Sequence, residues 1–167
     1  PLLPDNGHGG AKGYHRILVP LDGSELAEAI LPHVVPLAEE LAAEVTLLRV
    51  VHRGRWFGLA ESTLNDALSM ERVVASEYLE HVQRYLAEQG LSVRGIVEQG
   101  PPAERIVEVA RSQAVDLIAL STHGRSAIGR LVLGSVADEV LRTAGVPVLV
   151  NRNVSARARS EALEQQA

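Results

Sequence analysis

The sequence lacks cysteine, long apolar runs and an excess of positive charge. Without cysteine, the chain of 167 residues can form no disulfide, thiol nucleophile or cysteine-ligated metal site. No apolar run approaches the roughly 20 residues that a membrane-spanning helix needs, so no membrane association is expected. The formal net charge is -5, which argues against a general nucleic-acid-binding surface.

Signals for targeting and for several enzyme classes are missing as well. The first residues lack the charged-then-apolar order of a signal peptide, so the expected compartment is the cytoplasm. No GxGxxG motif follows the first expected strand, and the sequence has no GxSxG motif. No motif places a pair of carboxylates. We therefore expect no catalytic residues, and slow hydrolysis of a bound triphosphate at most.

The composition is that of one globular domain, with 46% hydrophobic and 22% charged residues. Residues 1–13 are rich in proline and glycine and are expected to form a flexible extension. Residues 14–151 are expected to form the domain. Residues 152–167 are polar, and we interpret them as a C-terminal tail.

Strand and helix patterns alternate along the domain. Strands are expected over residues 16–20, 44–51, 92–98, 116–120 and 148–150. Helices are expected over residues 24–42, 68–88, 101–111 and 135–143, the first of them kinked or broken by Pro32 and Pro36. Strands separated by helices run parallel with right-handed crossovers. The predicted fold is therefore an α/β doubly wound five-stranded parallel sheet, order 3-2-1-4-5, with helices on both faces.

One helix and the connection before it carry most of the remaining large apolar side chains. The connection, residues 52–66, contains Trp56 and Phe57, which we interpret as covering an apolar patch or an interface. The buried face of the following helix is expected to consist of Val73, Val74, Leu79, Val82 and Leu86.

The most informative segment runs from Ser121 to Val150. A strand leads into a turn of small residues, Ser121-Thr122-His123-Gly124, and Gly134-Ser135 opens a helix. The first turn of a helix offers free N–H groups and the positive end of the dipole, and glycine lets an anion approach them closely. A plain helix start without a ligand would look the same at Gly134-Ser135 alone.

The expected topology adds a second segment to this site. Doubly wound sheets bind ligands beyond the carboxyl ends of the strands where the winding reverses. If the first strand neighbours the fourth, residues 20–22 face residues 121–125 across that crevice. Asp22 then lies near the Gly-Ser helix start, although an Asp after a buried strand also commonly begins a turn.

These segments resemble the universal stress protein family. The opening RILVPLDGSELAEAIL is similar to the family's first strand and helix, and STHGRSAIGRLVLGSVADEVLRTAGVPVLV to its nucleotide-binding signature and last strand. In that signature, glycine, two residues, glycine and nine residues precede glycine with serine or threonine. Gly124 takes the second position, and Gly134-Ser135 completes the pattern.

The resemblance to the ATP-binding branch implies a ligand and roles for particular residues. The implied ligand is an adenine nucleotide, ATP with or without Mg²⁺, and AMP or cyclic AMP are alternatives. Residues near the phosphates would be Gly124, Arg125, Gly134, Ser135 and Val136. Those near the nucleoside would be Pro20, Leu21, Asp22, Val50 and Ser121.

Ser121 departs from the signature, which has glycine at that position. Its side chain either crowds the sugar or forms a hydrogen bond to it. If it prevents binding, the protein is a ligand-independent dimeric interaction protein with an unused site. The protein partner is unknown. A homodimer is expected through the strand at 146–150, because this apolar strand should lie at the edge of the sheet.

Overall fold

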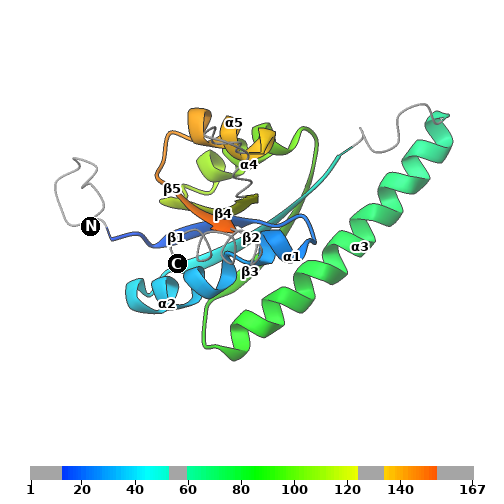
Figure 1. Ribbon diagram of the computed structural model, residues 1–167. Coiled ribbons are helices and arrows are strands. Elements are labelled where there is room, and N and C mark those ends of the chain that lie inside the picture. The colour runs from blue at the N-terminus through cyan, green and yellow to red at the C-terminus, as the bar shows by residue number, and fades with distance from the viewer. Residues whose placement is uncertain (1–12, 53–59, 124–133, 154–167) are drawn as a thin grey trace, which may run out of the picture.

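The computed structural model describes residues 13–52, 60–123 and 134–153. Five parallel strands form one sheet in the order β3-β2-β1-β4-β5, and helices cover both of its faces (Figure 1). The predicted fold class and strand order are confirmed. The strands are β1 Arg16–Pro20, β2 Glu44–Val51, β3 Val93–Gln99, β4 Leu117–His123 and β5 Val148–Asn153. The helices are α1 Glu25–Glu28, α2 Leu31–Leu41, α3 Glu61–Glu88, α4 Pro102–Ser112 and α5 Ser135–Thr143.

Strand β1 is the central strand of the sheet and contributes side chains to the core on both faces. It pairs in parallel with β2 on one side and with β4 on the other. Its side chains alternate between the faces: Ile17 and Val19 pack in one core cluster, and Leu18 packs in the other. All three are fully inaccessible to solvent, as expected for a central strand covered on both faces.

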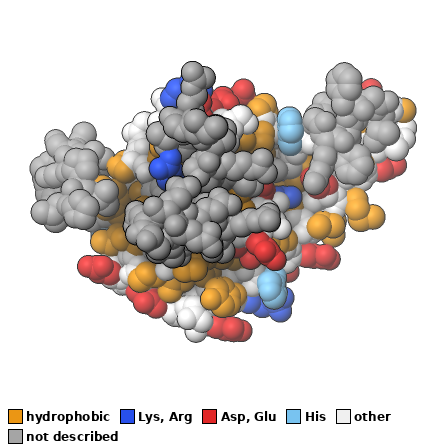
Figure 2. Space-filling model, viewed as in Figure 1, with side chains coloured by type: hydrophobic (Ala, Val, Ile, Leu, Met, Phe, Trp, Pro, Cys, Tyr) orange, Lys and Arg blue, Asp and Glu red, His pale blue; other side chains and the backbone are white. Residues whose placement is uncertain are grey.

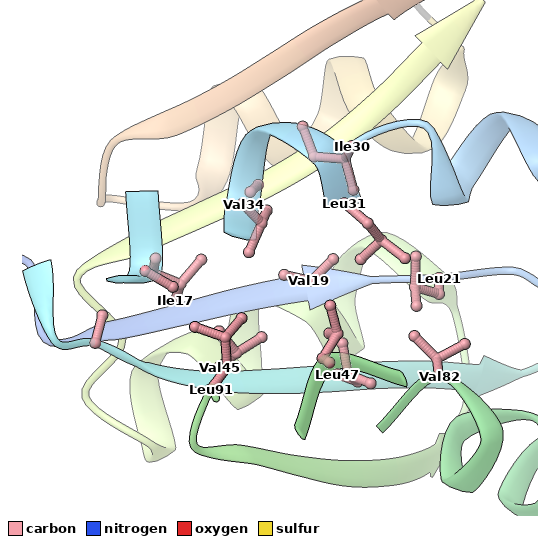
Figure 3. Packing of buried hydrophobic residues seen from close by; sticks show 14 of the residues in the cluster. Ile17, Val19, Leu21, Ile30, Leu31, Val34, Val45, Leu47, Val82 and Leu91 are labelled. Carbon is pink, nitrogen blue, oxygen red and sulfur yellow. The ribbon is translucent and has the colours of Figure 1, made fainter. Parts of the chain in front are cut away.

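Each core cluster belongs to one layer of helices. The first, beneath α2 and α3, contains Ile30, Leu31 and Val34 packed over β1 and β2 (Figure 3). The second lies beneath α4 and α5 and contains Ile106 and Val140. Because consecutive helices change face after β3, the connection into β4 brings that strand to the far side of β1. This reversal opens a crevice between β1 and β4.

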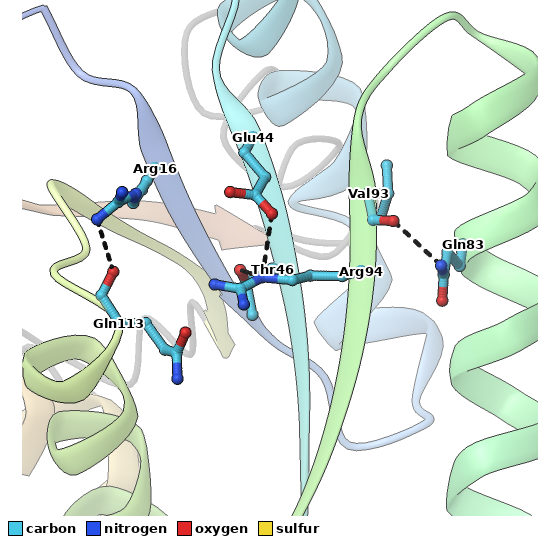
Figure 4. Close-up of polar contacts among 7 residues, drawn as sticks. All are labelled: Arg16, Glu44, Thr46, Gln83, Val93, Arg94 and Gln113. Atoms are coloured by element: carbon cyan, nitrogen blue, oxygen red, sulfur yellow. Dashed lines mark hydrogen bonds and ion pairs between the residues drawn. The ribbon is translucent and has the colours of Figure 1, made fainter.

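Polar contacts fix the amino ends of the strands (Figure 4). The Arg16 guanidinium donates to the carbonyl oxygen of Gln113 at 3.2 Å, and Arg94 donates to the Thr46 hydroxyl at 3.0 Å. Arg94 also forms an ion pair with Glu44 at 3.2 Å. These contacts lie at the amino ends of the strands, whereas the crevice lies at the opposite, carboxyl ends.

The first helical segment breaks earlier than the prolines indicate. Helix α1 ends at Glu28, and α2 begins at Leu31, so the break precedes Pro32. Pro32 occupies the first turn of α2, where its missing N–H costs nothing. Pro36 lies inside α2 without ending it. The predicted Ser24 cap is confirmed, because its hydroxyl accepts from the Ala27 N–H at 3.1 Å.

Helix α3 differs from its prediction in length and in its buried face. It begins at Glu61 rather than near residue 68, because Leu64 and Leu68 pack on Val51 and override the loop-like polar residues in this first part of the helix. Val73 and Val74 were assigned to the core but are 53% and 57% exposed. From Ala75 onward, the buried residues of this helix recur every three or four positions. They are Leu68, Ala75, Leu79, Val82 and Leu86.

The exposed side of α3 is therefore partly apolar. Met70, three residues before Val73, is also exposed, and Figure 2 shows hydrophobic side chains among acidic ones along this helix. In the described part of the chain, no helix combines the length and the apolar character needed to cross a bilayer. Trp56 and Phe57 lie outside the described residues, as do residues 1–12 of the expected N-terminal extension.

Two strands near the crevice extend further than the sequence indicates. Residues 121–123 were expected to form a turn, yet β4 continues through His123. Ser121, Thr122 and His123 pair in register with residues 151–153, so β5 also runs beyond residue 150. Pairing between the strands provides backbone hydrogen bonds that neither segment could form alone, which overrides the turn preference of the small residues. The expected tail at 152–167 thus begins within β5.

Tyr78 connects α3 to α1 beside the crevice. Its hydroxyl donates to a Glu28 carboxylate oxygen at 2.9 Å. Burial of the phenol raises the pKa of Tyr78 well above its usual value, and the hydrogen bond to Glu28 raises it further. The folded protein therefore keeps the phenol neutral at a pH where the unfolded chain ionises.

We expect Tyr78→Phe to lower the free energy of unfolding by about 1 kcal/mol at neutral pH. Because the folded pKa is raised, Tyr78 stabilises the fold fully below its unfolded pKa of about 10, and this contribution is lost as the pH rises above that value. The difference between wild type and variant should therefore shrink in alkaline urea titrations. Tyr85→Phe, at an exposed tyrosine of the same helix, is the matched control. If the difference in free energy of unfolding between wild type and Tyr78→Phe does not change with pH, the raised pKa assigned to Tyr78 is contradicted.

Candidate functional site

A cavity of about 340 Å³ lies at the carboxyl ends of β1 and β4, where the winding of the sheet reverses. Its size is within the range of small-molecule sites. Most of its wall is apolar, and the polar groups gather near the start of α5. The lining residues come from β1, α1, β2, α4, β4 and α5 and are Pro20, Leu21, Asp22, Leu26, Ala27, Leu48, Val50, Pro102, Ile106, Leu120, Ser121, Thr122, Gly134, Ser135, Val136 and Ala137.

The cavity brings together eight of the ten residues that the sequence assigns to the site. They come from four places distant in the chain and are Pro20, Leu21, Asp22, Val50, Ser121, Gly134, Ser135 and Val136. The other two, Gly124 and Arg125, lie outside the described residues. The topological argument that β1 meets β4 thus places Asp22 and the Gly-Ser helix start on one cavity.

Asp22 forms the turn that its position after β1 suggested. Its Oδ1 accepts from the backbone N–H of Ser24 at 3.0 Å and from the Ser24 hydroxyl at 2.5 Å. Within the described ranges, its second carboxylate oxygen accepts no hydrogen bond, and the side chain is exposed at the mouth of the cavity. One carboxylate oxygen of Asp22 therefore stabilises the turn, and the other can accept a hydrogen bond from a ligand.

The start of α5 presents backbone donors to the cavity. Gly134 is the N-cap, and Ser135 is the first residue of the helix, as predicted. The Gly134 N–H donates to the Thr122 hydroxyl at 3.2 Å, which ties the helix start to β4. The next N–H groups, at Ser135 and Val136, form no hydrogen bond to another described residue. First-turn N–H groups and the helix dipole together favour an anion here.

The glycine at position 134 is not required by the protein's own backbone. Its φ of -58° is open to any residue. Among the described residues, a Cβ built there would meet only the Thr122 hydroxyl oxygen, at 3.9 Å, which is ordinary contact. The backbone conformation and the described neighbours would therefore both accept a Cβ. Glycine at this position keeps open the space above the α5 N–H groups, which is the space that a bound anion would fill.

Sequence reasoning missed part of the cavity wall. Leu26 and Ala27 of α1 and Pro102 and Ile106 of α4 all line it. Helical residues of this kind also serve the core, so no local signal marks them. Thr122 could have been found, because a buried β-branched residue with a hydroxyl sits between two positions already assigned to the site.

Ser121 has a partner on the neighbouring strand. The Asn151 side-chain nitrogen donates to the Ser121 hydroxyl oxygen at 3.3 Å and to the carbonyl oxygen of Ala29 at 2.7 Å. Ser121 and Asn151 are register partners in β4 and β5. The serine that departs from the glycine signature is therefore part of a polar contact that joins β4, β5 and the end of α1.

Metal binding by the protein alone finds no support in the described part of the chain. No three histidine or acidic side chains come together there in a group that could hold an ion.

Comparison with known proteins identifies the family. A family model for the universal stress protein family matches residues 13–152, which is nearly the whole described chain. The chain belongs to the universal stress protein family. Universal stress protein MJ0531 of Methanocaldococcus jannaschii is 34% identical over 138 residues, covering 82% of this chain and 81% of that protein.

Solved structures of the family share the fold. MJ0577 of Methanocaldococcus jannaschii superposes with a TM-score of 0.75 at 32% identity, covering 86% of this chain and 99% of that one. The universal stress protein UspA of Lactobacillus plantarum gives a TM-score of 0.71 at 27% identity, covering 83% and 98%. The five-stranded parallel sheet of this universal stress protein, in the order 3-2-1-4-5, thus belongs to a fold that it shares with these structures.

The contact between Thr122 and Gly134 can be tested by removing one hydroxyl. Thr122→Val keeps the shape of the side chain but leaves the Gly134 N–H without its acceptor, so we expect the free energy of unfolding to fall by about 1 kcal/mol. Thr122→Ser keeps the hydroxyl and is the matched control. Urea denaturation measures both, and a valine variant as stable as the wild type would show that this hydroxyl does not hold the helix start.

Proposed function

We propose that this protein binds an adenine nucleotide, with ATP as the principal ligand, in the cavity between β1, β4 and α5. One observation carries the proposal. An apolar cavity ends at a helix start whose N–H groups are open and whose glycine leaves ligand-sized space without any backbone need for glycine. Anionic groups suit that end, and a flat apolar base suits the walls.

The proposed roles follow the polarity of the cavity. Phosphate oxygens accept from the N–H groups of Ser135 and Val136 and from the Ser135 hydroxyl, beside Gly134. The base lies against apolar residues such as Val50, and the free oxygen of Asp22 accepts from the nucleoside. Gly124 and Arg125, from the signature, complete the phosphate end. Magnesium, if bound, is held through the phosphates, because Mg²⁺ is commonly carried by substrate phosphates.

Known complexes of this fold support a nucleotide as the ligand. A universal stress protein solved in complex with cAMP shares the fold at a TM-score of 0.64 and 19% identity, and one from Archaeoglobus fulgidus in complex with dAMP at 0.58 and 20%. At these identities the comparison supports the ligand class through the shared fold. AMP and cyclic AMP remain the alternatives to ATP in the proposal.

The proposed activity is binding that responds to nucleotide, in a stress or regulatory role, rather than catalysis. A hydrolase needs a base positioned to activate water. Asp22, a carboxylate that lines the cavity, uses one oxygen to accept from the backbone of the turn. The second candidate is a ligand-independent dimeric interaction protein, which the exposed edge of β5 favours.

Calorimetric titration with ATP and adenosine tests the site. Ser135→Ala should weaken the binding of ATP by about 1 to 2 kcal/mol, because it removes one hydrogen-bond donor to a phosphate oxygen. The binding of adenosine should change little. Gly134→Val should abolish ATP binding, because its side chain would fill the space above the α5 N–H groups; the melting temperature checks that the variant remains folded. Ser69→Ala, at an exposed serine of α3, is the control. ATP binding that survives Gly134→Val unchanged places the site elsewhere.

We also propose that two copies associate through β5. This strand lies at the edge of the described sheet, next to β4 alone, so one side of its backbone pairs with no other described strand. Val148 and Leu149 are only partly buried there. An edge of this kind is usually covered or paired, and antiparallel pairing under a two-fold axis serves both subunits with one surface.

Sedimentation of the wild type and of Leu149→Asp or Val148→Lys tests this assembly. We expect a dimeric wild type at micromolar concentration and monomeric variants, because a charge at the edge opposes pairing. Far-ultraviolet circular dichroism must show that each variant remains folded, since both side chains also touch the core. A monomeric wild type rules out a strong dimer, and folded variants that stay dimeric place the interface elsewhere.

A further inference from the structure

Asn151 joins three elements beside the cavity. Its side-chain nitrogen lies 2.7 Å from the carbonyl oxygen of Ala29, after α1, and 3.3 Å from the Ser121 hydroxyl oxygen on β4. Asn151 itself is on β5 and is half-buried, as is Ser121. The three groups therefore form a short chain of hydrogen bonds between the edge strand and a residue that lines the cavity.

The direction of these hydrogen bonds follows from the chemistry of the groups. A backbone carbonyl can only accept, so the Asn151 NH₂ group, not its oxygen, must face Ala29. The same nitrogen then directs its second hydrogen at Ser121, whose oxygen accepts. A serine hydroxyl has one hydrogen to donate, and no acceptor for it is found among the described residues. Ser121 is therefore held as an acceptor toward Asn151 and has its own hydrogen available.

We infer that Ser121, positioned by Asn151, donates a hydrogen bond to an oxygen of the bound nucleotide. This inference rests on the proposed function, because it concerns the same cavity. The accepting oxygen is either that of a sugar hydroxyl or that of a phosphate. Ser121 thereby adds a side-chain donor from β4 to the cavity that Asp22 also lines, and it selects ligands that carry the matching acceptor.

The inference decides between the two roles left open for Ser121. If the side chain only crowded the ligand, Ser121→Gly would tighten binding. A donor predicts the opposite. Glycine at position 121 would also leave one Asn151 N–H without its present partner, which is unfavourable for a half-buried amide. Serine and asparagine at these register positions thus act as a pair.

The test is calorimetric titration of wild type and Ser121→Ala with ATP, 2′-deoxy-ATP, 3′-deoxy-ATP and adenosine. We expect Ser121→Ala to weaken ATP by roughly three- to tenfold, the effect of one hydrogen bond. If a sugar hydroxyl is the acceptor, the analogue that lacks this hydroxyl binds wild type and variant equally. If a phosphate oxygen is the acceptor, all three triphosphates weaken and adenosine does not.

Three results would overturn the inference: unchanged ATP affinity in Ser121→Ala, tighter binding by Ser121→Gly, or an equal loss for all four ligands, which indicates a merely structural role. A wild type that binds none of the four ligands instead contradicts the proposed function itself. Melting temperatures confirm that each variant is folded.

A double-mutant cycle tests the role of Asn151. If Asn151 acts by positioning Ser121, Asn151→Ala weakens ATP in the wild type but adds nothing in the Ser121→Ala background. Asn65→Ala, at an exposed asparagine of α3, is the control. Losses that simply add would show that Asn151 does not act through Ser121. Should Asn151→Ala fail to fold, the comparison of ligands in Ser121→Ala still decides whether Ser121 is a donor.

Discussion

Parallel pairing of β1 with both β2 and β4 is the constraint on which the rest of the structure depends. It places Ile17, Leu18 and Val19 at the centre of the molecule, fully inaccessible to solvent, with one layer of helices on each face. Since the chain reaches β2 and β4 by crossovers on opposite faces, the helices diverge at the carboxyl end of β1. The cavity is the space left by that divergence, so the arrangement that stabilises the core also creates the site.

Some residues of the site also stabilise the local backbone. Asp22 holds the turn before α1 with one oxygen, and Thr122 anchors the start of α5 to β4. These contacts fix the backbone in place before any ligand arrives, which lowers the entropic cost of binding. Gly134 donates its N–H to Thr122, but its φ and the described residues around it do not require the absence of a side chain. The proposed ligand would use the space that a side chain there would fill.

Edge strand β5 links the site to the proposed dimer. Its continuation to Asn153 lets Asn151 pair with Ser121 in register and reach the carbonyl of Ala29. A single strand thus carries the unpaired backbone available to a second subunit and a side chain that holds a residue of the cavity. Occupancy of the cavity and the proposed association at the edge would therefore both involve residues of β5.

The sequence by itself determined the strand-helix order, the central β1 and the Gly134-Ser135 helix start, because hydrophobic runs, glycines and cap residues are local signals. Tertiary structure alone decided the length of α3, which Leu64 and Leu68 extend by packing on Val51, and the exposure of Val73 and Val74, which depends on the side that α3 turns to the sheet. It also decided the continuation of β4 and β5 and the partner of Ser121. Each of these rests on contacts between residues far apart in the chain, whose free energy no local pattern contains.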